Sequence, residues 1–159
     1  MSVAARRTKA KQMEDLMRML ALHQQQFTCS QILLIMGLEA QGKTDPDLIR
    51  TMHALAGGIG GCGDVCGTLT GGACLLGLYA GRGTAEETED PRLNQMIGEL
   101  VAWFEERYDQ RYGSIRCADI LEGNPQNKTQ RCPDIIARTY EKVKELLIAN
   151  GFDWGGGEA

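Results

Sequence analysis

Residues 57–83 read GGIGGCGDVCGTLTGGACLLGLYAGRG, and this stretch decides how the rest of the chain folds around it. Eleven of its 27 residues are glycine, three are cysteine, and no charge falls between Asp64 and Arg82. A glycine inside a helix costs roughly 1 kcal/mol relative to alanine, so several together imply a compensating close contact. The stretch therefore predicts a buried helix over about residues 64–79 that lets another backbone or a bulky cofactor come close.

The glycines and cysteines of this stretch share a helical spacing. Gly63, Gly67 and Gly71 are four residues apart and would form a strip with almost no side chain along the helix. Cys62 and Cys66 would face one way, with Cys74 two turns further along. The preceding loop, which includes Gly61, leaves backbone N–H groups free to point at an anion: a nucleotide phosphate, a cluster sulfide or a thiolate. No phosphate-binding glycine motif is present, which disfavours the nucleotide.

The rest of the chain also carries helical patterns, and no run alternates enough to predict a sheet. Capping signals mark several helix starts, among them the Thr28–Gln31 capping box and the pairs Asp45-Pro46 and Asp90-Pro91. The expected helices cover residues 8–24, 28–40, 45–57, 64–79, 90–112 and 132–150, with one helical turn within 115–121. We therefore expect an all-α fold, a single compact helical bundle domain of about five to six helices over residues 1–159. Residues 1–7 and 152–159 are expected to be flexible ends.

The first of these helices has an apolar face that we expect to be its buried side. Helical periodicity places five residues on it: Met13, Leu16, Met17, Leu20 and Ala21.

Charge and hydropathy exclude several classes of partner. The net charge is −4, so the chain as a whole does not attract nucleic acid or an anionic membrane. Residues 65–81 are uncharged, but polar residues and glycines dilute them, and they fall short of the roughly 20 apolar residues that a bilayer requires. We expect neither nucleic-acid binding nor membrane insertion. No apolar run follows the basic start, which favours a cytoplasmic protein.

The six cysteines then become candidates for metal ligation, redox chemistry or simple core packing. Cys29 directly follows the Thr28 cap, and Cys132 precedes a proline in a capping position. Because a helix N-terminus stabilises negative charge, we expect both thiols to ionise more readily than a free one. No CxxC, CxxCH or ferredoxin spacing is present. His23, shortly before Cys29, is a weaker ligand candidate.

Four cysteines and their neighbours resemble a known family. The matching residues are Cys29 in FTCSQILL, Cys66 to Gly71 in VCGTLTGG, Cys117 in IRCADIL and Cys132 in RCPDI. The resemblance is to small redox-active proteins with one early cysteine, a central CGAxxG-type motif and two later cysteines, a module related to part of the split-Soret cytochromes. It covers roughly residues 25–145 and implies a helical domain that holds a redox centre on these four cysteines.

The chain departs from that pattern in two ways. Thr68 stands where the family has alanine, and Cys62 and Cys74 lie outside the set of four. These two cysteines are candidates for further metal ligands, a reversible thiol pair or core residues.

We expect an iron–sulfur protein, with a 4Fe-4S cluster or a larger one, that transfers or stores electrons rather than acting as a stand-alone enzyme. The candidate metal ligands are Cys29, Cys66, Cys117, Cys132, Cys62 and Cys74, and the candidate residues of the cofactor-binding backbone are Gly61, Gly63, Gly67 and Gly71. A redox partner protein and a homodimer are expected as well. The alternatives are a thiol–disulfide oxidoreductase that uses paired cysteines, and a structural zinc-binding or dimerisation module.

Overall fold

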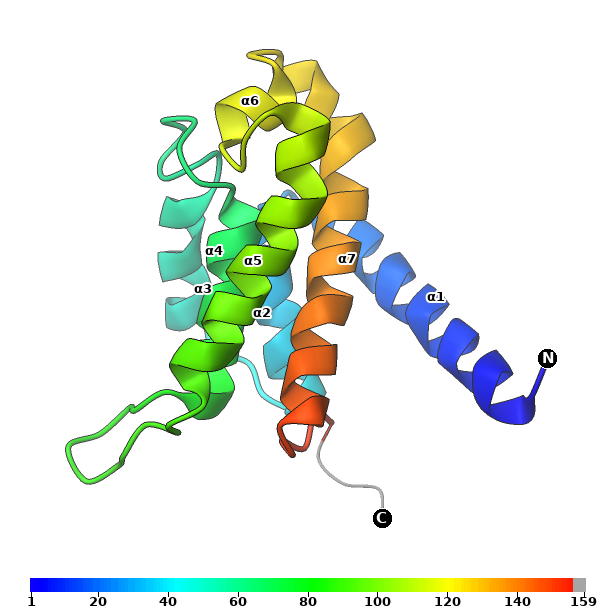
Figure 1. Ribbon diagram of the computed structural model, residues 1–159, viewed down its shortest axis with the longest axis vertical. Coiled ribbons are helices and arrows are strands. Elements are labelled where there is room, and N and C mark those ends of the chain that lie inside the picture. Colours follow the sequence, from blue (N-terminus) through cyan, green and yellow to red (C-terminus); the bar gives the residue numbers. More distant parts are fainter. Residues whose placement is uncertain (156–159) are drawn as a thin grey trace.

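The computed structural model of the chain describes residues 1–155 and is all-α, as the sequence predicted (Figure 1). The only β-type pairing among these residues is one isolated bridge, between Val65 and Arg116. The described α-helices are α1 (Val3–Gln24), α2 (Cys29–Ala40), α3 (Pro46–Met52), α4 (Gly67–Ala80), α5 (Leu93–Tyr112), α6 (Cys117–Leu121) and α7 (Lys128–Ala149). Two 3-10 turns, η1 (His53–Leu55) and η2 (Pro125–Asn127), join them. The helix α6 is the helical turn expected within residues 115–121.

The glycine-rich helix α4 lies inside the bundle, packed against α2, α5 and α7 (Figure 1). A Cβ on Gly71 would lie 2.9 Å from the Cα of Ser30 in α2. A Cβ on Gly72 would lie 3.1 Å from side-chain atoms of both Leu100 in α5 and Thr139 in α7. The missing side chains therefore let three helices approach one helix at once, which is the close contact that the glycines implied.

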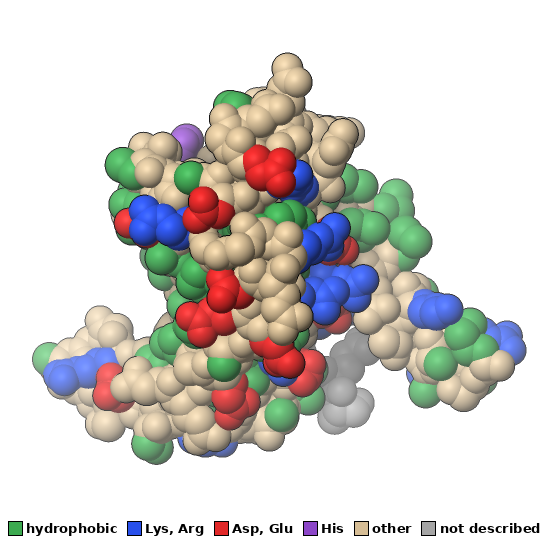
Figure 2. Space-filling model, turned by 45° about the horizontal axis from the view of Figure 1, so that its top comes forward, with side chains coloured by type: hydrophobic (Ala, Val, Ile, Leu, Met, Phe, Trp, Pro, Cys, Tyr) green, Lys and Arg blue, Asp and Glu red, His purple; other side chains and the backbone are tan. Residues whose placement is uncertain are grey.

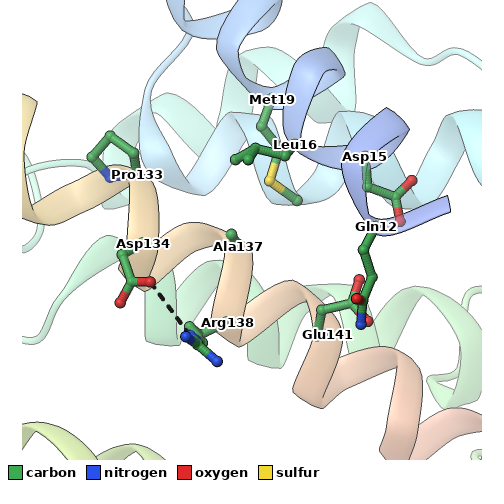
Figure 3. Close-up of a pocket in the computed structure, with 9 residues that line it drawn as sticks. All are labelled: Gln12, Asp15, Leu16, Met19, Pro133, Asp134, Ala137, Arg138 and Glu141. Atoms are coloured by element: carbon green, nitrogen blue, oxygen red, sulfur yellow. Dashed lines mark hydrogen bonds and ion pairs between the residues drawn. The ribbon is translucent and has the colours of Figure 1, made fainter. Parts of the chain in front are cut away.

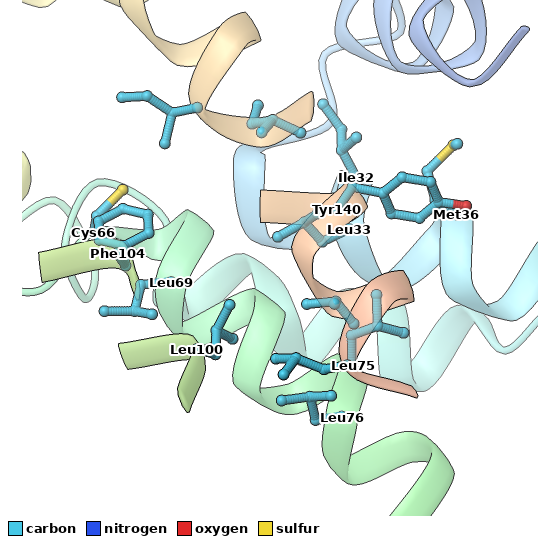
Figure 4. Close-up of a cluster of buried hydrophobic side chains, with 14 of the residues drawn as sticks. Ile32, Leu33, Met36, Cys66, Leu69, Leu75, Leu76, Leu100, Phe104 and Tyr140 are labelled. Carbon is cyan, nitrogen blue, oxygen red and sulfur yellow. The ribbon is translucent and has the colours of Figure 1, made fainter. Parts of the chain in front are cut away.

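The hydrophobic core surrounds α4. Its fully buried side chains come mainly from α4, α5 and α7, and Figure 4 shows several of them together with Cys66. The hydrophobic residues at 0% exposure are Leu33, Leu75, Leu76, Met96, Leu100, Phe104, Tyr108, Val143 and Leu147. Two of them, Leu75 and Leu76, belong to α4 itself, and Met96, Leu100, Phe104 and Tyr108 follow one another along α5. Packing, rather than any single polar contact, therefore fixes α4 in place.

The helix α4 begins later than the sequence predicted. It starts at Gly67, so Gly63 and Cys62 lie in the preceding loop and not on its glycine strip. That loop folds back on itself: the Asp64 amide donates to the Gly58 carbonyl at 3.0 Å, and Gly58 has a φ of +70°. A Cβ on Gly58 would lie 2.3 Å from the Asp64 carbonyl oxygen. The prediction that Cys62 and Cys66 face the same way is wrong, because Cys62 is exposed and Cys66 is buried.

The last helix, α7, begins earlier than predicted. The Asn124 side chain accepts from the Gln126 amide and opens η2, which runs directly into α7 at Lys128. The interpretation of Cys132-Pro133 as a helix start is therefore wrong, and Cys132 lies one turn inside the helix. The helical stretch that leads into α7 therefore starts at the pair Asn124-Pro125.

The first helix, α1, turns a different face to the bundle from the one predicted. Its buried residues are Met19 and Leu22, whereas Met13, Met17 and Leu20 are exposed. The expectation that these three residues are buried is wrong. In Figure 1, the N-terminal half of α1 projects away from the rest of the molecule.

At the other end of the chain, Trp154 stacks on Tyr79 with ring centroids 5.4 Å apart, and Phe152 packs against the core. Residues 152–155 were expected to belong to a flexible end but lie against the domain, and residues 156–159 are outside the described part. Within residues 1–155, every helix is too short or too polar to span a bilayer.

Candidate metal centre

Four of the six cysteines line a single cavity, and each comes from a different helix. Cys29 is the first residue of α2, Cys66 is the N-cap of α4, Cys117 is the first residue of α6, and Cys132 lies near the start of α7. All four border a cavity of about 260 Å³. The bundle thus brings together thiols that are more than 100 residues apart in the chain.

Backbone pairing holds the middle two cysteines close to each other. The Cys66 amide donates to the Ile115 carbonyl at 2.9 Å, and the Cys117 amide donates to the Asp64 carbonyl at 2.8 Å. These bonds flank the bridge between Val65 and Arg116. They tie the start of α4 to the start of α6, and so place two thiols on adjacent walls of the cavity.

Gly67 lines the cavity beside Cys29, where a side chain would not fit. A Cβ on Gly67 would lie 2.9 Å from Cys29 Sγ and 2.8 Å from the Leu55 carbonyl oxygen. Any larger residue at Gly67 would therefore displace the Cys29 thiol. The remaining lining is mostly apolar and includes Phe27, Ala56, Ile120, Leu121, Ile135 and Ile136.

Burial controls the ionisation of the four thiols. Burial, and after it the proximity of the other thiols, raises the pKa of Cys66 to about 11 and the pKa of Cys132 to about 12. Burial also raises the pKa values of Cys29 and Cys117. Without a bound cation, the cavity therefore favours four neutral thiols, since charged sulfurs there would be poorly solvated and would repel one another.

The prediction that helix starts make Cys29 and Cys132 ionise readily is therefore wrong. For Cys132 the premise fails, because it does not cap α7. For Cys29 the premise holds, and the backbone N–H of Ser30 does favour the thiolate, but desolvation outweighs it and the pKa of Cys29 is raised. A helix end provides partial charges, whereas burial removes most of the solvent around the sulfur.

Several hydrogen-bond donors nevertheless point at the sulfurs. The Thr68 hydroxyl lies within hydrogen-bonding reach of both Cys29 and Cys66, where it lowers the pKa of each thiol against the effect of burial. The backbone N–H groups of Thr68 and Leu69, at the start of α4, act on Cys66 in the same direction. Thr68 stands at the position where the family pattern has alanine, so its hydroxyl adds a donor to this site.

Two further polar side chains border the cavity. Lys128 lowers the pKa values of Cys117 and Cys132, and exposed His23 lies at the other edge. Sequence reasoning missed Lys128 because a lone lysine in a polar stretch resembles any surface lysine. It considered His23 only because it precedes Cys29.

The structure does not bring the other candidate residues into this cavity. Cys74 is exposed on α4, and Cys62 is exposed in the glycine-rich loop. Cys62, Gly61 and Gly63 border a neighbouring surface depression, which shares Cys117 with the cavity. Gly71 packs against α2 and does not line the cavity, so Gly67 is the member of the predicted strip that does.

A larger surface groove lies elsewhere, between α1 and α7, with a volume of about 540 Å³ (Figure 3). Its charged groups include Asp134 and Arg138, which pair at 3.3 Å. It contains no cysteine or histidine. The groove therefore offers neither a thiol nor an imidazole, whereas four thiols line the smaller cavity.

The donor set of the cavity suits a thiolate-ligated group. Thiolates select soft or borderline metals such as zinc, copper(I) and iron–sulfur clusters. Among residues 1–155, no three His, Cys, Asp or Glu side chains stand in a metal-coordinating arrangement, so the four thiols would have to turn inward before they could share a metal ligand. The free volume and the apolar walls leave them room to do so.

The family described as "Putative redox-active protein (C_GCAxxG_C_C)" matches residues 27–146, which is most of the chain and includes all four cysteines of the cavity. The chain belongs to this family. Its members are described as redox-active, which confirms the family and the general activity expected from the cysteine pattern. In this redox-active protein, the four-cysteine pattern that gives the family its description maps onto the walls of one cavity. Neither the curated proteins nor the solved structures provide a significant match to the chain.

Proposed function

We propose that this redox-active protein holds an iron–sulfur cluster on Cys29, Cys66, Cys117 and Cys132 and uses it to carry or store electrons. The observation that carries the proposal is the convergence of these four thiols, from four helices, on one apolar cavity. A bound cluster would supply a centre that takes up and releases single electrons. The thiols would lose their protons on binding it, because the metal needs thiolates.

The size of the cavity favours a cluster over a single metal ion. A tetrahedral zinc ion holds its four sulfurs about 2.3 Å away and leaves no space between them. The cavity has about 260 Å³ of free volume, whereas one water molecule takes about 30 Å³ in the liquid. A 4Fe-4S cluster is the default assignment, since it takes four cysteine ligands.

The surroundings would tune such a centre. The Thr68 hydroxyl and the N–H groups at the start of α4 are donors for sulfur, and hydrogen bonds to sulfur shift the reduction potential of a cluster. The apolar walls limit access of water, which also sets the potential. A redox partner protein would exchange electrons at the cavity mouth, where Lys128 and His23 lie.

A thiol–disulfide enzyme fits the site less well. The reacting species in disulfide exchange is the thiolate, and burial raises the pKa values of all four cavity thiols. None of the six cysteines forms a disulfide in the structure. The cavity thiols are thus less ready to act as nucleophiles than the low-pKa cysteines of disulfide-exchange enzymes.

Anaerobic reconstitution tests the proposal. The protein is incubated with ferrous iron and sulfide under reducing conditions, and then iron, sulfide, zinc and the visible absorption are measured before and after dithionite. We expect stoichiometric iron and sulfide and a brown colour that bleaches reversibly. A colourless protein without iron would contradict the proposal, and stoichiometric zinc without iron would indicate the structural alternative instead.

Single variants locate the ligands. Cys66→Ser should lose most of the bound iron, and Cys132→Ser should do the same. Cys74→Ser is the matched control: the same substitution on an exposed cysteine of α4, which should keep the full iron content. Equal loss in all three variants would show that the cavity cysteines have no special role.

A further inference from the structure

An unpartnered apolar seam runs along α1 and does not involve the proposed metal site. Val3, Met13, Met17 and Leu20 are exposed by 68%, 57%, 64% and 44%. These four account for more than half of the large hydrophobic side chains that residues 1–155 leave exposed, the others being Met1, Ile59 and Ile148. Exposed apolar residues scattered singly need no explanation, but a contiguous row of them on one helix does.

The row follows the spacing of a coiled coil. Alternating steps of three and four residues connect Val3, Arg6, Ala10, Met13, Met17, Leu20 and Gln24. This is the a/d spacing of a heptad repeat over three heptads, and five of its seven positions are apolar, the exceptions being Arg6 and Gln24. It keeps one face of a helix in contact with a partner helix for about 25 Å.

The seam lies opposite the side of α1 that packs on its own bundle. Met17 and Met19 are two residues apart and so point to nearly opposite sides of the helix, and Met19 is buried. The same inner side carries Asp15, which pairs with Lys144 of α7 at 2.9 Å. Figure 3 shows Leu16 and Met19 directed toward the groove at α7. The outer side is therefore free for a partner, and the rest of the domain would not obstruct it.

The N-terminal part of α1 has little else to hold it. Of residues 1–14, all are exposed except Ala5, which is half-buried. In Figure 2 this part of the chain forms an arm that carries hydrophobic and basic side chains. An isolated helical segment of about 12–15 residues is only marginally stable in water, so a partner along the seam would account for this arm.

The charges on α1 are complementary to α1 itself in an antiparallel arrangement. Arg6, Arg7, Lys9 and Lys11 make its first half basic. The first acidic residue that can face a partner is the exposed Glu14, because Asp15 pairs with Lys144 on the inner side. A parallel pair would set four cations against four cations. An antiparallel pair brings the basic half of each helix to Glu14 of the other, and residues flanking a seam of this kind set its orientation.

We propose that the outer seam of α1 binds the same seam of a second copy of the chain, antiparallel, to form a twofold homodimer. One patch then meets its own copy across a twofold axis, as in most homodimers. The two bundles lie on opposite sides of the helix pair. The dimer leaves both thiol cavities open, and α1 connects each of them to the interface through His23 and the short link to Cys29.

Sedimentation equilibrium of the purified, metal-free protein over a wide range of concentrations tests the proposal. We expect a reversible monomer–dimer equilibrium. Met17→Glu should weaken it about a hundredfold, because one charge enters the seam from each copy and two methionine side chains leave it. Since Met17 is exposed in the monomer, circular dichroism should show an unchanged fold.

Two further variants keep the test decisive. Ile148→Glu is the matched control, because Ile148 is 58% exposed on α7 and lies outside the seam, and it should leave the dimer unchanged. Arg6→Leu removes the only charge from the seam and should tighten the dimer about tenfold. A wild-type chain that stays monomeric at every concentration would overturn the proposal, and so would equal weakening by Met17→Glu and Ile148→Glu.

Discussion

Two glycines of α4 allow a paired test of how this fold is assembled. Gly71 and Gly77 both lie inside the helix, and alanine is the better helix former by roughly 1 kcal/mol at either position. Their surroundings differ. A Cβ on Gly77 meets nothing within 4 Å, whereas a Cβ on Gly71 would lie 2.9 Å from the Ser30 Cα and 3.3 Å from the Ser30 carbonyl oxygen.

The contacts decide the sign of each effect. Gly77→Ala should raise the free energy of unfolding by up to about 1 kcal/mol, the gain in helix propensity. Gly71→Ala gains the same but pushes α4 away from the backbone of α2, and overpacking of this kind costs about 1–3 kcal/mol. The shift also disturbs the buried hydrogen bond from Ser30 Oγ to the Met52 carbonyl, 2.7 Å long and worth about 1 kcal/mol. We expect a net loss of about 1–3 kcal/mol for Gly71→Ala.

Urea unfolding of the metal-free protein, followed by circular dichroism, measures both variants against the wild type. The metal must be absent because a bound ligand adds its own free energy to the apparent stability. In thermal unfolding the two variants should differ by several degrees, since 1 kcal/mol moves the Tm of a domain of this size by about 2–4 °C. If both alanines stabilise the protein equally, α4 and α2 do not need their close approach, and the account of the glycines given above is wrong.

Three other perturbations test separate parts of the structure. The pKa of Cys66 is raised to about 11 from 9.0, so folding favours its protonated form. This thiol alone should cost the metal-free protein up to about 3 kcal/mol of stability as the pH rises from 9 through 11, and Cys66→Ala should remove that share of the loss in pH-dependent unfolding. Trp154→Ala removes the ring stacked on Tyr79 and should lower the free energy of unfolding by about 1–3 kcal/mol. Unchanged urea unfolding would mean that the C-terminal segment adds nothing to the stability of the domain. Lys144→Ala leaves Asp15, which is only 15% exposed, without its partner across the α1–α7 contact, and we expect it to lower the free energy of unfolding by about 1–3 kcal/mol. The control is Lys142→Ala, which removes a lysine that pairs only within α7 and should cost less than about 1 kcal/mol.

Local signals in the sequence predicted the helices well. The Thr28–Gln31 capping box and the Asp45-Pro46 pair mark the starts of α2 and α3, because a cap satisfies N–H groups of its own first turn and needs no distant partner. In α5, apolar residues recur at helical spacing, and Met96, Leu100 and Phe104 among them are buried. Helix boundaries without a strong cap were less predictable: α4 starts at Gly67 because a distant segment, residues 115–118, pairs with the chain just before it.

The four cysteines of the cavity were also identified from the sequence, through their order and their match to a family pattern. The sequence did not predict that Cys62 and Cys74 lie apart from these four cysteines, because spacing along one helix cannot show where that helix begins. The Thr68 hydroxyl and Lys128 entered the site only through the fold, since each is an ordinary residue until another helix places it beside a thiol.

The sequence by itself determined that the chain is helical, which residues begin several of its helices, and which four thiols belong together. These are properties of neighbouring residues and of a linear pattern. Only the tertiary structure decided how readily those thiols ionise and which face of α1 meets water. Both depend on solvent exclusion by residues far away in the chain: the packed walls of the cavity raise the pKa values of Cys66 and Cys132, and the bundle covers Met19 while it leaves Met17 exposed.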